Sequence, residues 1–247
     1  MLEYLDWDEA IEELSPHIVR IATPDGSGTG FLVFHSTTSD VVAIATAAHV
    51  VDRAHYWEQP IRVEHTSSGT STILRPANRA IFIERERDTA AVVFSKDSLK
   101  IPDRTLNLTP EGKVLKVGFE IGWLGYPAVY QQELCFFSGR ISRFATGLSG
   151  YLVDGVAING VSGGPAFWNG GQRITLIGVV SAYLVNRATG ETLPGLSLVR
   201  DVYQFRELSK TFKTVDEAKE KEEKPATPPP PPPQAPSNPT SVVGGTR

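Results

Sequence analysis

A single serine within a run of glycines constrains this chain more than any other stretch. Ser162 lies in the segment Gly160–Pro165, which reads Gly-Val-Ser-Gly-Gly-Pro, with apolar strand-like segments on both sides. Glycines let the backbone turn where a side chain would clash, and the turn exposes N–H groups next to the hydroxyl. Such a turn can present a nucleophile together with an oxyanion hole, the amides that stabilise developing negative charge.

Two enzyme classes place a catalytic serine in the pattern Gly-x-Ser-x-Gly, and the order of the histidines in this chain excludes one of them. In α/β-hydrolases the serine begins a helix, and the catalytic histidine follows it in the chain. Here Gly163, Gly164 and Pro165 are poor helix formers, and every histidine precedes Ser162. The histidines are His17, His35, His49, His55 and His65. An order of histidine, aspartate and serine remains open, and that is the order of chymotrypsin.

Composition indicates a globular chain that does not bind nucleic acid. With 247 residues, 40% of them apolar, the chain can bury a sizeable core. A net charge of −4 argues against a surface for phosphate backbones, which needs a basic patch. The single cysteine, Cys135, excludes an internal disulfide framework and suits a reducing compartment. Segment 1–9 lacks a signal-peptide pattern, and no apolar run could span a bilayer, so we expect a cytoplasmic protein without a membrane partner.

Hydrophobic periodicity predicts many short strands in two groups. The first group comprises segments 18–21, 29–34, 41–46, 61–64, 79–83 and 89–94. The second comprises segments 114–117, 121–124, 132–137, 151–153, 174–182 and 196–199. Between them lies the polar, proline-containing segment 102–112, a plausible linker. This pattern predicts an all-β fold of two antiparallel six-stranded β-barrels.

Helical periodicity appears at both ends of the chain. Near the N-terminus, Asp6 and Glu9 stand at capping-box spacing around an apolar helical face. That face consists of Trp7, Ala10, Ile11 and Leu14. Near the C-terminus, a stripe at spacings of three and four predicts a second helix that docks by its apolar side. Its members are Val202, Phe205, Leu208, Phe212 and Val215.

The end of the chain is rich in proline. Its polar segment 217–224 and proline run 228–233 cannot bury enough apolar area to offset the entropy lost on ordering. We expect a solvated spacer; the alternative is a polyproline ligand for a partner with an aromatic groove. The expected division of the chain is an N-terminal helix at 1–16, a first β-barrel at 17–103, a second β-barrel at 104–200, a C-terminal helix at 201–224 and a disordered Pro-rich tail at 225–247.

His49 is the leading general base, since it follows the apolar segment 41–46. His55 and His65 have polar neighbours and are expected at the surface, while His17 and His35 border strands and are weaker candidates. There is no His-Glu-x-x-His motif and no cysteine–histidine cluster, so neither a metal nor another cofactor is expected.

A base of this kind needs an acid that orients its ring and stabilises its charged form. Asp88 is the best candidate, because a strand beginning at Thr89 would hold it rigidly. Asp52 lies only three residues after His49 on the same helical turn. It cannot easily face the imidazole from the opposite side, and we reject it.

Several short motifs occur together in a known order. They are segments 28–31, 46–50, 88–90, 125–127, 160–165 and 178–181. Across residues 17 to about 200, the chain resembles the trypsin-like (chymotrypsin-fold) serine peptidases, especially the bacterial HtrA-like and related cytosolic forms. The resemblance implies paired six-stranded barrels with the active site between them. It implies His49 as general base, Asp88 as orienting acid and Ser162 as nucleophile, with the amides of Gly160 and Ser162 as oxyanion hole.

The chain departs from this family at positions that control activation and specificity. Val161 stands where secreted digestive relatives carry an aspartate that pairs with a new N-terminus, so we expect no such activation. The residues expected to bind the substrate side chain are Val156, Ser181 and Tyr183. Val156, six residues before the serine, corresponds to the floor of the family's S1 pocket, and Tyr183, two after Ser181, would narrow it. We therefore expect cleavage after small or medium apolar residues. A loop shift that brought Asp154 into the pocket would reverse this preference.

The expected function is that of a serine endopeptidase acting on protein or peptide substrates through an acyl-enzyme. One alternative is a catalytically idle barrel that serves as a binding module and recruits a partner through its Pro-rich tail. A third reading is an esterase that uses the same three residues.

Overall fold

The computed structural model describes residues 6–97, 99–130, 132–170, 173–185 and 192–223. For residues 182–185 and 192–194 it describes the backbone alone. The proline-rich tail predicted from the sequence lies outside the described residues.

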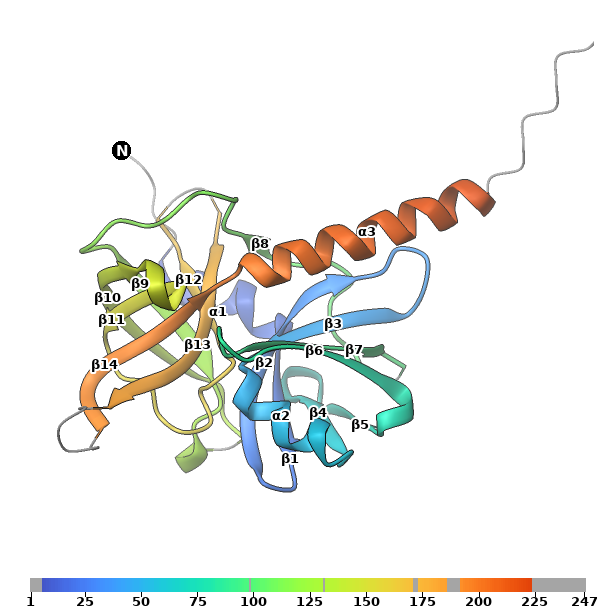
Figure 1. Cartoon of the computed structure of the whole chain (residues 1–247), viewed down its shortest axis with the longest axis horizontal. Helices are drawn as coiled ribbons and strands as arrows, with labels where there is room; N and C mark the ends of the chain where they lie inside the picture. Colours follow the sequence, from blue (N-terminus) through green and yellow to red (C-terminus); the bar gives the residue numbers. More distant parts are fainter. Residues whose placement is uncertain (1–5, 98, 131, 171–172, 186–191, 224–247) are drawn as a thin grey trace, which may run out of the picture.

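The first half of the chain forms one antiparallel sheet of seven strands (Figure 1). The strands are β1 (Ile18–Thr23), β2 (Gly26–His35), β3 (Val41–Thr46), β4 (Ile61–His65), β5 (Thr70–Leu74), β6 (Arg79–Glu84) and β7 (Thr89–Ser95). Their order in the sheet is β5-β4-β1-β2-β3-β7-β6. Helix α2 (Ala48–Tyr56) follows β3 directly.

The second half forms another seven-stranded sheet, six strands of which close into a barrel because β12 also pairs with β13. The strands are β8 (Asn107–Leu108), β9 (Glu120–Gly125), β10 (Cys135–Ala145), β11 (Gly150–Asp154), β12 (Pro165–Trp168), β13 (Thr175–Val185) and β14 (Thr192–Asp201). Their order is β12-β9-β10-β11-β14-β13-β8, and the two-residue β8 pairs in parallel with β13 outside the ring.

The predicted class, an all-β fold of two barrel-like antiparallel sheets flanked by helices, is confirmed. The predicted strand number of six differs from the seven strands found in each sheet, and the closed six-stranded ring is that of the second sheet. The predicted strand at 114–117 is wrong, because local turns take up this segment. The amide of Lys113 donates to Pro110 at 3.2 Å and that of Phe119 to Lys116 at 3.3 Å. Val117 is 65% exposed, so its apolar side chain has no sheet to pack against.

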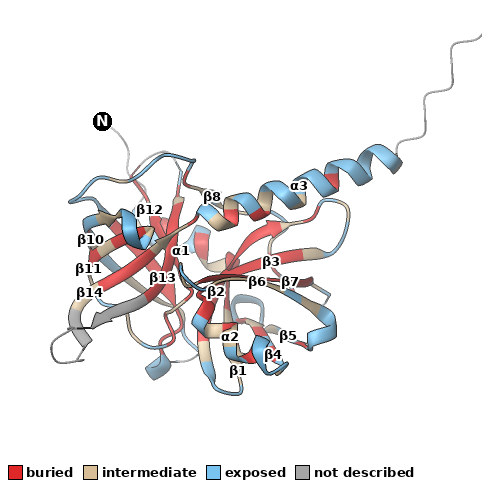
Figure 2. Cartoon of the chain, in the orientation of Figure 1, coloured by how far each residue is buried: buried red, intermediate tan, exposed pale blue. Residues whose placement is uncertain are grey.

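A shared core fills the space between the two sheets, and the inner strands are buried along their length (Figure 2). Strand β3 shows how the sequence builds it. Val42 and Ile44 point into the first barrel, whereas Ala43 and Ala45 point to the seam between the barrels. Because successive side chains alternate between faces, a continuous apolar strand can serve two cores at once. Alanines on the seam side let the second barrel approach closely.

Helix α1 (Trp7–Leu14) and helix α3 (Tyr203–Glu223) both pack against this shared core. The predicted N-terminal helix is confirmed, although the Asp6 side chain makes no capping hydrogen bond. Of the C-terminal stripe, Phe205 is fully buried and Phe212 stacks on Phe34 at 5.0 Å between ring centroids, but Val215 is 46% exposed.

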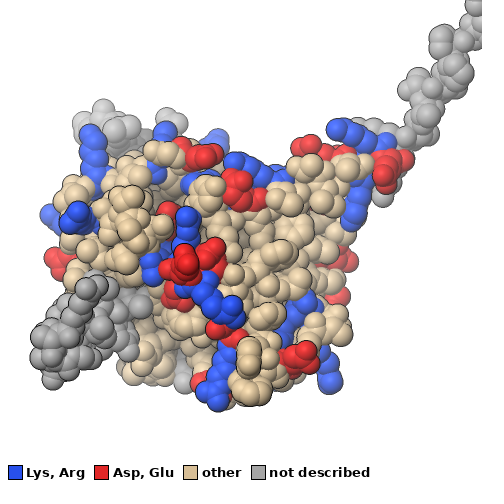
Figure 3. All heavy atoms as spheres, in the orientation of Figure 1, with Lys and Arg blue, Asp and Glu red and all other residues tan. Residues whose placement is uncertain are grey.

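The described surface carries both signs of charge. On the face shown in Figure 3, acidic and basic side chains are interspersed rather than gathered by sign. Among the described helices, none is long and apolar enough to cross a membrane.

Candidate active site

His49 stands in the first turn of α2, where the chain changes from strand to helix. Ala47 keeps an extended backbone, with φ −77° and ψ 143°, and the helix begins at Ala48. One face of α2 packs into the first barrel through Ala48, Val51 and Ala54. The imidazole of His49 lies on another face of the helix and is 50% exposed.

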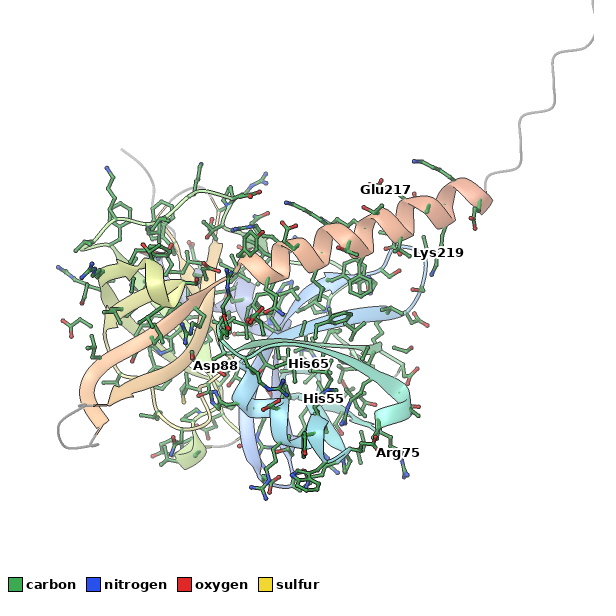
Figure 4. All side chains as sticks on the ribbon, in the orientation of Figure 1. His55, His65, Arg75, Asp88, Glu217 and Lys219 are labelled. Atoms are coloured by element: carbon green, nitrogen blue, oxygen red, sulfur yellow. The ribbon has the colours of Figure 1, made fainter. Side chains whose placement is uncertain are left out.

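Asp88 meets His49 although 39 residues separate them. Strands β3 and β7 are antiparallel neighbours in which Thr46 pairs with Ala90, so the end of one lies beside the start of the other. The Asp88 carboxylate receives three contacts from His49: Nδ1 lies 2.9 Å from Oδ2 and 3.1 Å from Oδ1, and the backbone N–H donates to Oδ1 at 3.0 Å. A carboxylate at Nδ1 favours the tautomer that leaves Nε2 free to accept a proton. Figure 4 labels Asp88 at the junction of the barrels.

The Asp88 carboxyl is held in its charged form. Burial by itself would raise its pKa, but the hydrogen bonds and charge of His49, together with the Ser181 hydroxyl, outweigh burial and lower the pKa. The Ser181 Oγ donates to Asp88 Oδ2 at 2.5 Å. Ser181 belongs to β13, so the second barrel also holds the carboxylate.

Ser162 lies on a turn in which two positions, 160 and 163, have a backbone conformation that favours glycine. Gly160 has φ +90° and Gly163 has φ +88°, values that side chains rarely adopt. A Cβ on Gly163 would stand 2.0 Å from the Thr29 carbonyl oxygen, and one on Gly160 would stand 2.3 Å from the Tyr126 carbonyl oxygen. The glycines around the serine therefore let its turn press against neighbouring backbone.

Ser162 and His49 both line the same open groove of about 460 Å³. The Ser162 hydroxyl donates to the Ser181 carbonyl at 3.2 Å. Within the described part of the chain, it makes no hydrogen bond to the imidazole. Ser181 thus contacts two of the three predicted residues, Asp88 through its side chain and Ser162 through its backbone.

The backbone N–H groups of Gly160 and Ser162 are the candidate oxyanion hole, and a hydrogen bond to the Asn159 carbonyl orients the first of them. The Asn159 carbonyl accepts from the Ala128 N–H at 2.7 Å. Because a trans peptide points its C=O and N–H in opposite directions, the Gly160 N–H faces away from Ala128. Among the described residues, neither the Gly160 N–H nor the Ser162 N–H has a protein acceptor. Both residues line the groove, so an oxyanion could occupy this position.

Of the predicted specificity residues whose side chains the structure describes, Val156 and Ser181 are not among those that line this groove. Val156 is 51% exposed and is not part of the groove lining. The Tyr183 side chain lies outside the described residues. Ser181 is buried and interacts with Asp88 and Ser162, as described above. The apolar preference inferred from Val156 stays a prediction.

The other acidic and histidine candidates have separate partners. Asp52 pairs with Arg85 at 2.7 Å. The prediction that His65 lies at the surface is wrong: it is 3% exposed, and its Nε2 lies 2.9 Å from the Pro16 carbonyl oxygen. The alternation of Ile61, Val63 and His65 on one face of β4 is the signal that could have placed it inside. In the described ranges, no three His, Cys, Asp or Glu side chains cluster as a metal site would require.

The two antiparallel barrels, with a histidine, an aspartate and a serine at their junction, are the fold of the chymotrypsin-type serine peptidases. The chain belongs to the family of trypsin-like peptidase domains, whose sequence model matches residues 28–179. The resemblance inferred from the short motifs is therefore confirmed.

Solved structures of distant sequence share this fold. A serine endoprotease from Yersinia pestis gives a TM-score of 0.61 at 16% identity, over 84% of this chain and 66% of that chain, just under two thirds of its length. The Rv3671c protease in an inactive form gives 0.57 at 16% identity, over 86% and 98%. An inactive serine-to-alanine mutant of Rv3671c from M. tuberculosis H37Rv gives 0.55 at 16% identity, over 92% and 100%. No protein of curated function matches the chain in sequence.

Proposed function

We propose that the protein is a serine endopeptidase whose Ser162 attacks the carbonyl carbon of a peptide bond. His49 takes the hydroxyl proton at Nε2 and then gives it to the departing amine, while Asp88 orients the ring and stabilises its charged form. The amides of Gly160 and Ser162 stabilise the oxyanion. Water then hydrolyses the acyl-enzyme by the same steps.

One observation carries this proposal: the Asp88 carboxylate holds Nδ1 of an imidazole that lines the same groove as Ser162. The Asp88 side chain is partly buried, at 19% exposure, whereas the His49 imidazole is half exposed, at 50%. This arrangement leaves Nε2 as the ring nitrogen available to a substrate and to the serine. A purely structural histidine would be expected to have both nitrogens engaged by the protein, as in His65, whose Nδ1 lies 2.7 Å from the Ser68 hydroxyl and whose Nε2 lies 2.9 Å from the Pro16 carbonyl oxygen.

The proposed attack requires a change in the Ser162 side chain. Its hydroxyl donates to the Ser181 carbonyl, and a rotation about χ1 would move Oγ without moving the turn. We infer that a bound substrate carbonyl, held by the two amides, selects the rotamer that faces Nε2. Catalytic hydrogen bonds often tighten only in the substrate complex.

The open groove and the family support a proposal for the substrate class. We propose protein or peptide substrates, with a small or medium apolar side chain before the cleaved bond. The Asp25–Arg53 ion pair, 3.1 Å apart, borders the same groove as Ser162. Cleavage of a mixed peptide library, read by mass spectrometry, gives the residue preference on both sides of the cut.

A fluorophosphonate probe tests the nucleophile directly. Wild-type protein should be labelled at Ser162, and Ser162→Ala should lose labelling and peptide cleavage together. Ser67→Ala, which removes an exposed serine in the first barrel, is the matched control and should retain both.

Absence of labelling and of peptide products in the wild type would contradict the proposal and favour the idle binding module. Ester turnover without amide turnover would favour the esterase.

A further inference from the structure

Thr29 is a fully buried residue of β2 whose hydroxyl points at the serine turn of the other barrel. Its Oγ1 donates to the Gly160 carbonyl at 2.8 Å and accepts from the Tyr126 N–H at 2.9 Å. Its own N–H donates to the Ser162 carbonyl at 2.8 Å. These contacts bridge the first barrel to both sides of the candidate oxyanion hole.

We propose that Thr29 is a positioning residue that keeps the Gly160 N–H directed into the groove. This inference rests on the proposed peptidase function, since it concerns the amide that would stabilise the oxyanion.

The physical reason lies in the glycine itself. The φ of +90° at Gly160 requires a residue without Cβ, yet such a residue has no side chain to restrain its rotation. Hydrogen bonds to the two carbonyls around it must therefore hold the orientation. The Ala128 N–H holds the carbonyl of Asn159, and the Thr29 hydroxyl holds that of Gly160.

A single hydroxyl serves two backbone groups of the other barrel. The Gly160 carbonyl needs a donor and the Tyr126 N–H needs an acceptor, and one hydroxyl satisfies both. Valine at position 29 would keep the shape but leave both backbone groups buried and unpaired. The freed carbonyl belongs to the peptide that follows Gly160, whereas the Gly160 N–H belongs to the peptide before it. We expect loss of this hydrogen bond to loosen the rotation of Gly160, which joins the two peptides, so that its N–H leaves the groove for part of the time.

The test compares Thr29→Val, Thr29→Ser and Thr109→Val in the full chain. Thr109 is a matched control, because its buried hydroxyl also donates to a backbone carbonyl at 2.8 Å, that of Leu176. Each variant is assayed for kcat and KM on a peptide chosen from the library, for inhibition by the matching peptidyl trifluoromethyl ketone, and for thermal unfolding.

Thr29→Val should lower kcat by about ten- to a hundredfold, the scale of a displaced oxyanion donor. KM should change by less than about threefold, because ground-state binding does not depend on that donor. Affinity for the trifluoromethyl ketone, which forms an oxyanion analogue, should fall by the same factor as kcat. Thr29→Ser should restore kcat and the affinity for the inhibitor, and Thr109→Val should alter thermal unfolding alone.

Wild-type kcat and inhibitor affinity in folded Thr29→Val would overturn the proposal. Amide hydrogen exchange distinguishes this failure from failure of the proposed function, because it needs no activity. Exchange at Tyr126 and Val161 should accelerate in Thr29→Val but not in Thr29→Ser. If the wild type cleaves nothing and this exchange is unchanged, both proposals are wrong.

Discussion

Asp88 combines an unusual backbone conformation with several partners. Its φ is +48°, in the left-handed region where few residues other than glycine occur, and its N–H closes a turn on the Arg85 carbonyl at 3.2 Å. Aspartate tolerates this region better than most residues. The turn aims the carboxylate at His49 and Ser181, and it does so one residue before β7 begins.

Replacing Asp88 by asparagine removes the charge while nearly preserving the shape. We expect kcat to fall by about 10⁴-fold, because an amide can stabilise the wrong imidazole tautomer and cannot balance an imidazolium. The control is Asp52→Asn, which alters the other aspartate near His49, the one paired with Arg85.

Peptide hydrolysis measured across pH is the readout, and the Asp52 variant should stay within about threefold of the wild type. If both variants retained activity, Asp88 would not be the orienting acid.

At the scale of elements, helix α3 is attached along its length by two kinds of contact. Its first turns dock through buried apolar residues such as Phe205. Further along, Asp216 is 7% exposed, although it follows the exposed Val215 and begins the polar part of the helix. Its carboxylate accepts from Ser36 Oγ at 2.7 Å, the Thr37 N–H at 2.9 Å and Thr38 Oγ1 at 2.9 Å. The loop between β2 and β3 is thereby fastened to the helix, as the view in Figure 1 illustrates.

Asp216→Ala should therefore destabilise the fold by about 1–3 kcal/mol, since it leaves several donors without their charged acceptor. Glu217→Ala is the matched control: Glu217 is the next residue and is exposed (Figure 4), so its loss should cost less than about 0.5 kcal/mol. Urea unfolding followed by circular dichroism measures both. Equal effects of the two variants would show that the hydrogen bonds of Asp216 to the β2–β3 loop do not contribute to stability.

At the scale of the whole molecule, two buried histidines tie the N-terminal segment to the rest of the fold. His65 of the first barrel contacts the Pro16 carbonyl at 2.9 Å. His17 contacts the carbonyl of Arg104 at 3.1 Å, and Arg104 belongs to the segment that links the two sheets in the sequence. Burial lowers the pKa of each imidazole, and in both it outweighs the backbone carbonyls, which act in the opposite direction. Protonating either ring would therefore oppose the folded state.

The sign of the pH dependence follows from these lowered pKa values. Below about pH 6.5, the ordinary histidine value, the unfolded chain binds protons that the folded chain does not, so stability should fall as pH decreases. Each histidine contributes a slope of up to about 1.4 kcal/mol per pH unit.

The free energy of unfolding, measured in urea between about pH 5 and 7, tests the predicted loss of stability. This pH range lies above the ordinary pKa values of carboxyl groups, so histidines dominate the change. His65→Gln should reduce the slope, whereas His55→Gln, at an exposed position, should not. A flat profile in the wild type would contradict the prediction.

The sequence predicted the elements better than their contacts. Strands β3 and β7 were expected from their apolar runs, and α1 and α3 from helical spacing. The strand expected at 114–117 failed because an apolar run indicates burial only when a neighbouring strand is available. The two-residue β8 left no period to detect, and the alternating β5 was not recognised.

For the candidate site, local sequence was enough to single out His49, Asp88 and Ser162, because each sits at the end of an element or on a glycine turn. It could not show what fixes them. The Thr29 hydroxyl reaches Gly160 across 131 residues, and Ser181 reaches Asp88 across 93. These contacts form only when the two barrels pack together, and no local sequence pattern predicts which residues then meet.

By itself, then, the sequence determined the all-β class, the helices at either end and the order of the three candidate residues. Short-range rules govern these features: strand and helix periods, and the need for glycine where φ is positive. Only the tertiary structure decided which polar groups are buried and paired, as with Thr29, His65 and Asp216. A buried polar side chain needs a partner to offset the cost of losing water, and each of these three residues has partners distant in the chain, which only the folded structure brings close.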